Sequence, residues 1–167
     1  MIRNFSKPFF LYLLLATALY SCAQPKSMVK KLNAYTFQKL PGTVRAQNDD
    51  SELVKPVTVL VVYAEAKTAD IVWDSAWFNS GVYKLEARLS SNGLFEVGFE
   101  KETGKMILLK ADSGLYLYQI HLQPVEGNHP ISPKYEEGKI LLKGKYYGKD
   151  FYRTTGPPAE ISTYDAQ

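Results

Sequence analysis

Hydrophobic and polar residues alternate with a period of two through most of the chain beyond residue 33, and this pattern predicts β-strands. The segment Val57–Ala66 is an exception, because it is apolar at odd and even positions alike. A strand without a polar face is typical of the middle of a sheet that is covered on both sides. We therefore expect Val57–Ala66 to be the central strand of the fold.

The section from Val82 to Leu122 has the most regular alternation, interrupted by short turn sequences. Asn92-Gly93 favours a tight hairpin because both residue types tolerate positive φ angles. The segments between the turns are Tyr83–Ser90, Phe95–Glu100, Met106–Ala111 and Leu115–Leu122. We expect a four-stranded antiparallel meander with one face exposed to solvent.

Further strand signals lie on either side of this section. They occur in Ala34–Leu40, Thr43–Gln47, Ile71–Phe78, Lys139–Tyr147 and Phe151–Thr155. Pro41-Gly42 is a turn dipeptide between the first two segments and favours a hairpin there. In the third segment, period-two alternation places Ile71, Trp73 and Trp77 on one face.

The resulting fold class is all-β, an antiparallel sandwich or a small barrel of roughly eight to ten strands. No stretch shows a sustained period of 3.6 residues, so no helix is predicted in the β domain. We expect this domain to cover residues 34–156, because Gly156-Pro157-Pro158 interrupts regular structure. Residues 157–167 are then expected to form a loose C-terminal tail.

One connection is longer than the fold requires. Gln123–Gly138 spans about 16 residues with several prolines, which exceeds most connections in compact domains. Loops of this kind are frequently functional, and prolines reduce the entropy lost on binding. The candidate partner-binding residues are His129, Lys134 and Tyr135, and the alternative is a surface loop without function.

The first 21 residues have the layout of a secretory signal peptide. Arg3 and Lys7 form a basic start without acidic residues, and Phe9–Tyr20 is a largely apolar run of 12 residues. A membrane-spanning helix needs about 20 apolar residues, so this run is too short to span and fits a signal peptide instead.

The segment Leu19-Tyr20-Ser21-Cys22 follows this run and contains the one cysteine of the chain. It resembles the lipobox of bacterial envelope lipoproteins, with Tyr20 bulkier than the small residue usual there. The resemblance implies cleavage before Cys22 and attachment of diacylglycerol to its thiol, which would anchor the chain to a membrane. Two or three acyl chains give a stable anchor at about 0.8 kcal/mol per buried CH₂. An uncleaved anchor and a secreted protein with a free cysteine are the alternatives.

Residues 22–33 are expected to form the lipidated tether, because they are polar and contain a proline. No acidic residue follows Cys22 directly, which by the same resemblance implies the inner leaflet of the outer membrane and a domain in the periplasm. Five bases and no acids lie between Ala23 and Asn48: Lys26, Lys30, Lys31, Lys39 and Arg45. They could contact anionic head groups, at about 1 kcal/mol per base, or remain solvated.

The mature chain is nearly neutral, which argues against a nucleic acid partner. The whole sequence has 20 Lys and Arg against 17 Asp and Glu, and the leader holds two of these bases, Arg3 and Lys7. This leaves 18 bases and 17 acids, without the basic excess of nucleic-acid-binding domains. One cysteine and two histidines give no basis for a disulfide framework or a Cys/His metal centre.

The standard catalytic and nucleotide-binding motifs are absent, so no catalytic residue, metal or cofactor is predicted. His121 and His129 have no local partners that indicate catalysis. The loop Asn48–Glu52 offers oxygen ligands for Ca²⁺ but lacks the spacing of a calcium-binding loop. Asp70 and Asp74 would lie about 13 Å apart along a straight strand, beyond the separation of glycosidase carboxylates.

The aromatic residues Trp73 and Trp77 have polar neighbours and are the candidate ligand-stacking residues, for a sugar or a lipid. The competing interpretation places both rings in the core between two layers of strands, and we favour it.

The sequence therefore favours a lipid-anchored envelope domain without enzyme activity, which binds a protein partner or assembles beside a membrane-associated complex. Two alternatives stay open. A lipocalin-like carrier of a small apolar or sugar ligand would need a closed barrel with an empty interior. A hydrolase would need an acid or a nucleophile that converges with His121 or His129.

Overall fold

The computed structural model describes residues 28–39, 56–127 and 133–162, and these residues form ten strands. The first five are β1 (Val29–Lys39), β2 (Val57–Ala66), β3 (Val72–Phe78), β4 (Gly81–Leu89) and β5 (Leu94–Glu100). The others are β6 (Met106–Lys110), β7 (Tyr116–Pro124), β8 (Leu141–Tyr146), β9 (Lys149–Thr154) and β10 (Ala159–Ser162). The described residues include no helix that is long and apolar enough to cross a membrane.

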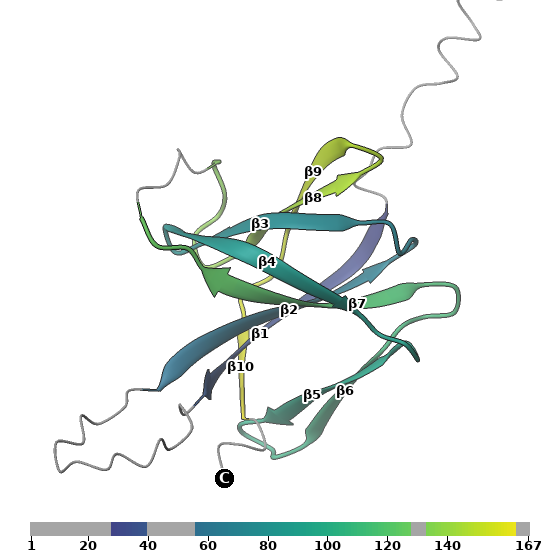
Figure 1. Cartoon of the computed structure of the whole chain (residues 1–167). Coiled ribbons are helices and arrows are strands. Elements are labelled where there is room, and N and C mark those ends of the chain that lie inside the picture. Colours follow the sequence, from purple (N-terminus) through teal and green to yellow (C-terminus); the bar gives the residue numbers. More distant parts are fainter. Residues whose placement is uncertain (1–27, 40–55, 128–132, 163–167) are drawn as a thin grey trace, which may run out of the picture.

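All ten strands belong to one curled sheet, in the order β6-β5-β10-β1-β2-β7-β4-β3-β8-β9 (Figure 1). The predicted all-β class is confirmed, and the sheet forms a half-barrel. The neighbouring strands are antiparallel except β1 and β10, which run parallel. The fold is thus one continuous sheet that bends over itself, instead of two separate sheets.

β2 lies in the middle of the sheet, between β1 and β7, and is buried on both faces from Leu60 onward. Its even-numbered residues, such as Val62, belong to one hydrophobic cluster. Its odd-numbered residues, such as Val61 and Tyr63, belong to a second cluster. The prediction that Val57–Ala66 is a central strand covered on both sides is therefore confirmed.

The first cluster fills the half-barrel between β1, β2 and β7 and the strands β3, β8 and β9. Trp73 lies at its centre, with its ring edge-on to Tyr118 at 6.0 Å and to Phe151 at 5.9 Å between centroids. Gly144 is the sheet neighbour of both Trp73 and Phe151. A Cβ atom on Gly144 would lie 2.7 Å from the Phe151 ring, so the glycine makes room for this aromatic contact.

The second cluster lies on the opposite face of β2. Val61 and Tyr63 pack there against the β5–β6 hairpin and β10, through residues such as Val97 and Ile161. Opposite faces of the same central strand are thus covered by opposite ends of the sheet. The sheet consequently curls in one direction beyond β7 and in the other direction beyond β1.

The meander predicted from Val82 to Leu122 is wrong in its pairing, although its four strands are present. β4 pairs with β7 and β3, and β7 pairs with β2. Of the four strands β4 to β7, only β5 and β6 pair with a strand that is next to them in the sequence of the predicted meander. A tight turn lies instead at Asn79-Ser80, where both residues have positive φ (46° and 64°), and it joins β3 to β4. After β4, the chain instead crosses through Asn92-Gly93 to the other face of the sheet.

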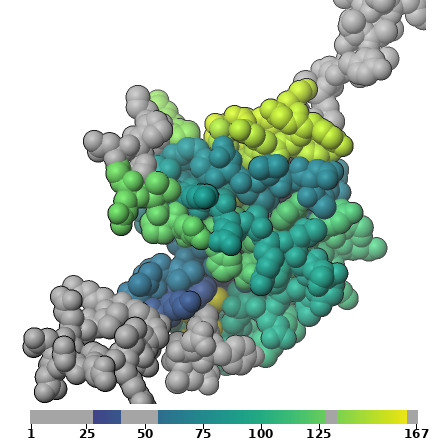
Figure 2. Space-filling model, viewed as in Figure 1, coloured from purple at the N-terminus to yellow at the C-terminus, as the bar shows by residue number. Residues whose placement is uncertain are grey.

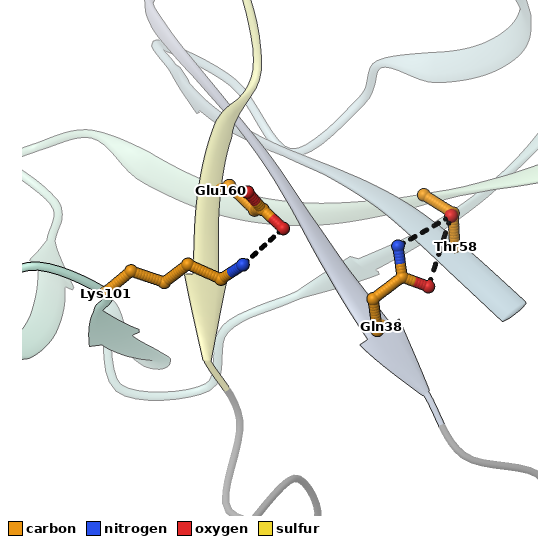
Figure 3. A network of polar contacts seen from close by, with 4 residues as sticks. All are labelled: Gln38, Thr58, Lys101 and Glu160. Atoms are coloured by element: carbon orange, nitrogen blue, oxygen red, sulfur yellow. Dashed lines mark hydrogen bonds and ion pairs between the residues drawn. The ribbon is translucent and has the colours of Figure 1, made fainter. Parts of the chain in front are cut away.

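The predicted loose tail, residues 157–167, contains a strand. β10 pairs with β1 and with β5, so it connects the β5–β6 hairpin to the rest of the sheet. An ion pair between Lys101, next to the end of β5, and Glu160 of β10 supports this connection (Figure 3). The prediction failed because β10 is short and directly follows two prolines, which remove the usual pattern of a strand.

The predicted tether, residues 22–33, is too long at its C-terminal end, because β1 begins at Val29. A register shift between Val29 and Lys31 leaves two consecutive lysines, Lys30 and Lys31, exposed, and this breaks the alternation that marks a strand. β1 then pairs along its length with β2. The predicted hairpin partner, Thr43–Gln47, lies outside the described residues.

We predict that Gly98→Ala weakens the attachment of β10. Gly98 has a φ of 146°, and a Cβ atom there would lie 2.5 Å from the carbonyl oxygen of Ser162. Gly104→Ala is the matched control, because its φ is also positive (66°) but the space around it is open. The control should lose about 1 kcal/mol of unfolding free energy, and Gly98→Ala about 1–3 kcal/mol more. Equal losses in urea denaturation would show that β10 does not pack against Gly98.

Candidate functional site

An apolar pocket of about 300 Å³ lies at one open end of the half-barrel, on the face of the first cluster. Strand ends from both sides of the half-barrel contribute to it: the end of β1, the start of β2, the end of β7 and the β3–β4 hairpin. Its lining consists of Thr36, Thr58, Leu60, Phe78, Tyr83, Leu122, Pro124 and Pro158. Figure 2 shows the molecule indented on this side, between the blue start of β2 and the green segment that follows β7.

The register of the sheet explains why these residues meet. Leu60 of β2 lies between Thr36 of β1 and Leu122 of β7, and Leu122 is in turn opposite Leu85 of β4. Residues directly opposite one another in a sheet point to the same face. The curl of the sheet then brings Phe78 across from β2, so the pocket lies between two layers of one sheet.

A few polar groups lie within this apolar lining. The Thr58 hydroxyl exchanges hydrogen bonds with the side-chain amide of Gln38, at 3.0 and 3.3 Å, at the edge of the pocket (Figure 3). Burial raises the pKa of the Tyr83 phenol, and the neighbouring Tyr135 raises it further. Tyr83 therefore stays protonated at neutral pH and can donate a hydrogen bond. An apolar pocket with few polar groups is typical of small-molecule sites, for which about 300–1,000 Å³ is usual.

The long loop returns to the sheet beside this pocket. The Tyr135 hydroxyl accepts a hydrogen bond of 3.2 Å from the backbone N–H of Ser80, in the β3–β4 turn. A second, more polar hollow of about 430 Å³ lies here, lined by Ser80 and Tyr135 together with Asn79 and Glu137. Of the predicted partner-binding residues, Lys134 is exposed and Tyr135 is half-buried, whereas His129 lies outside the described residues.

The two tryptophans point to different faces of β3, so the prediction that they share a face is wrong. The register of β3 against β8 shifts between Trp73 and Ser75, which inserts one extra residue at Asp74. Trp73 is buried in the first cluster, as the core-packing interpretation expects. Trp77 lies on the outer face next to Tyr152, at 6.3 Å between ring centroids. The structure therefore does not bring the two rings together as one stacking platform.

The acidic residues and histidines considered as catalytic candidates do not converge. Asp74 is bound by Lys143 at 3.2 Å, and Asp70 accepts a hydrogen bond from Thr68 at 3.0 Å. His121, on β7, is half-buried opposite Glu86. Within the described residues, no group of three or more His, Cys, Asp or Glu side chains is placed to hold a metal ion. The Asn48–Glu52 loop lies outside these residues.

Comparison with protein-family models, curated proteins and solved structures gives no match for this chain.

Sequence reasoning missed the pocket residues because their alternation indicates a filled core. Thr36 and Phe78 lie in segments with ordinary strand patterns, and nothing local shows that they face each other across the half-barrel. One signal was available: Thr58 is a polar residue on a face of β2 that is otherwise apolar through Leu60 and Val62.

We predict that His121 makes the domain less stable in acid. Burial, and then the nearby Arg88, lower the pKa of His121 below its usual value of 6.5, while Glu86 opposes this shift. The unfolded chain therefore binds a proton at a higher pH than the folded chain, so stability is lost as the pH falls through 6.5 toward the lower folded pKa. Between about pH 7.5 and about pH 5.5, the thermal midpoint should fall more for wild type than for His121→Gln. Identical pH profiles would contradict this assignment.

Proposed function

We propose that the chain is a lipid-anchored envelope protein without enzyme activity whose β domain binds a small apolar ligand in the half-barrel pocket. The observation that carries this proposal is the apolar pocket of about 300 Å³ at the open end of the curled sheet. The sheet is an open half-barrel filled around Trp73, so it lacks the closed barrel with an empty interior that a lipocalin-like carrier would need. The apolar pocket at its open end is what supports binding of a small apolar ligand.

The direction of β1 supports a periplasm-facing pocket. Thr36, in the pocket lining, lies seven residues after Val29, where the described chain begins its first strand. At about 3.3 Å per residue, this places the pocket about 23 Å from the tether end of β1. A lipid on Cys22 would hold the other end of the domain at the membrane. The pocket would then open away from the bilayer, and ligand would enter from the aqueous compartment.

A protein partner at the Gln123–Gly138 loop stays compatible with this proposal. The hydrogen bond from Ser80 to Tyr135 positions the loop next to the pocket, and Lys134 is exposed beside it. A partner that docks there would cover the polar hollow and contact the pocket entrance. We therefore assign Lys134 and Tyr135 to a surface where a protein partner would exchange ligand with the pocket, rather than to a separate site.

The pocket is tested with an apolar fluorescent dye such as N-phenyl-1-naphthylamine. Thr36→Phe places an aromatic ring into the pocket and should raise the dissociation constant of the dye at least about tenfold, because the ring occupies space that the dye would need. Thr154→Phe adds the same ring at an exposed position of β9 and should leave dye binding unchanged. Equal affinities of the two variants, or no binding by wild type, would refute an apolar ligand site in the half-barrel.

The anchor is tested separately by Cys22→Ser. A hydroxyl cannot form the thioether to diacylglycerol, so we predict that this variant loses incorporated radioactive palmitate and leaves the detergent phase in Triton X-114 partitioning. Wild type should be labelled and enter that phase. If both proteins partition identically and neither is labelled, the lipobox interpretation fails, whatever the dye experiment shows.

A further inference from the structure

The end of the half-barrel opposite the pocket is a rim of strand ends. The register places Val29 at the start of β1 opposite Ala66 at the end of β2, and Ala66 opposite Tyr116 at the start of β7. The start of β3 and the end of β8 meet at Val72 and Lys145. In Figure 1, the start of β1 and the β8–β9 turn are both on the upper right side of the molecule.

Contacts within the domain connect neighbouring strand ends of this rim. The N–H of Lys67 donates to the carbonyl oxygen of Met28 at 2.9 Å, which joins the ends of β1 and β2. Met28 and Tyr146 both pack against the first cluster, from opposite sides of the half-barrel. Burial raises the pKa of Tyr146, and the nearby Asp70 of the β2–β3 connection adds to that rise.

This rim carries large exposed apolar and aromatic side chains. Tyr147, at the tip of the β8–β9 turn, is 79% exposed, and Val72 beside it is 63% exposed. Tyr116 and Leu89 at the neighbouring ends of β7 and β4 are 44% and 40% exposed. Tyr147 contacts Tyr146 at 4.4 Å between ring centroids. Tyrosine suits the boundary between lipid and water, because its ring is apolar and its hydroxyl is polar.

The rim also carries an excess of positive charge. Its exposed bases are Lys30, Lys31, Lys67, Lys145 and Lys149. The carboxylates near it are Asp70, Asp112, Asp150 and Glu65. Asp150 is bound by Lys143 at 3.1 Å, and the buried Glu65 accepts a hydrogen bond of 2.5 Å from the backbone N–H of Asp112. None of the five lysines has an ion pair with a carboxylate of the described residues. Lysines around exposed tyrosines complement the head groups of an anionic membrane.

We propose that this rim, which we call the tether rim, lies directly on an anionic lipid surface, with Tyr147 and Tyr116 at head-group level and the five lysines around them. The proposal deepens the proposed function, since it assigns the membrane contact of the anchored domain. Cys22 precedes Met28 by six residues, which span at most about 21 Å when fully extended. A lipid on Cys22 would therefore keep the tether rim close to the bilayer.

The test uses the chain from residue 22 onward with Cys22→Ser, so that neither the leader nor a lipid contributes to binding. All ten strands of the described fold lie within residues 28–162, so this chain contains them. Binding is measured by co-sedimentation with vesicles of phosphatidylcholine alone or with 30% phosphatidylglycerol, a composition in the range of anionic membranes. We expect binding to the anionic vesicles that weakens with added salt.

Two charge-reversal variants decide whether the rim makes this contact. The rim variant replaces Lys67, Lys145 and Lys149 by Glu, and the control replaces Lys39, Lys84 and Lys105 by Glu, away from the rim. Each base near the surface changes binding about fivefold, so the rim variant should bind at least about a hundredfold more weakly and the control within about fivefold of wild type. Equal losses in the two variants, or no preference of wild type for anionic vesicles, would overturn the proposal.

A fluorescence measurement separates membrane contact from general charge attraction. In Tyr147→Trp, emission should shift to the blue and be quenched by brominated lipid when anionic vesicles are added. Val57→Trp, at the other end of β2 and 57% exposed in wild type, should show neither change. If Tyr147→Trp is not quenched, the rim does not reach the lipid, even if Cys22 is labelled with palmitate. If Cys22 is not labelled but the rim binds vesicles, the anchor fails and the rim proposal stands.

Discussion

The fold depends on burying both faces of β2. A strand with apolar residues on both sides cannot lie at the surface, because each exposed face would leave large side chains in water. The two ends of the sheet meet this requirement by curling over opposite faces, with Trp73 and Phe151 on one side and Val97 and Ile161 on the other. The half-barrel is thus a consequence of one central strand.

This arrangement also determines where function can reside. The first cluster fills the half-barrel around Trp73, but it ends in an apolar pocket. Thr36 and Thr58 line this pocket at positions that larger apolar residues would fill. The opposite strand ends form the tether rim, where β1 begins. Because β1 runs from one end to the other, a membrane contact at the rim and a ligand site in the pocket would be separated by the length of the domain.

The sequence was sufficient for most of the strands, β10 and the start of β1 excepted, but not for their pairing. Alternation depends on which face a residue occupies, so it identified Val57–Ala66 and the strands between Val82 and Leu122 correctly. Pairing depends on contacts between distant segments, and a period of two cannot show that β4 lies next to β7 and β3. The extra residue at Asp74 moves Trp77 to the other face of β3, and the alternation in the sequence does not show this shift either. The pocket was missed because its lining comes from strands that are distant in the sequence and face each other across the half-barrel. The lipid on Cys22 stays a prediction that rests on the leader alone.

The ligand site in the half-barrel is tested most directly by methyl NMR spectroscopy of the selectively labelled mature chain during titration with an apolar ligand. We predict that the methyl resonances of Leu60 and Leu122, in the pocket lining, shift in a saturable manner. Those of Val97 and Ile161, in the second cluster, should stay unchanged. Unchanged pocket resonances, or equal shifts in both clusters, would contradict it.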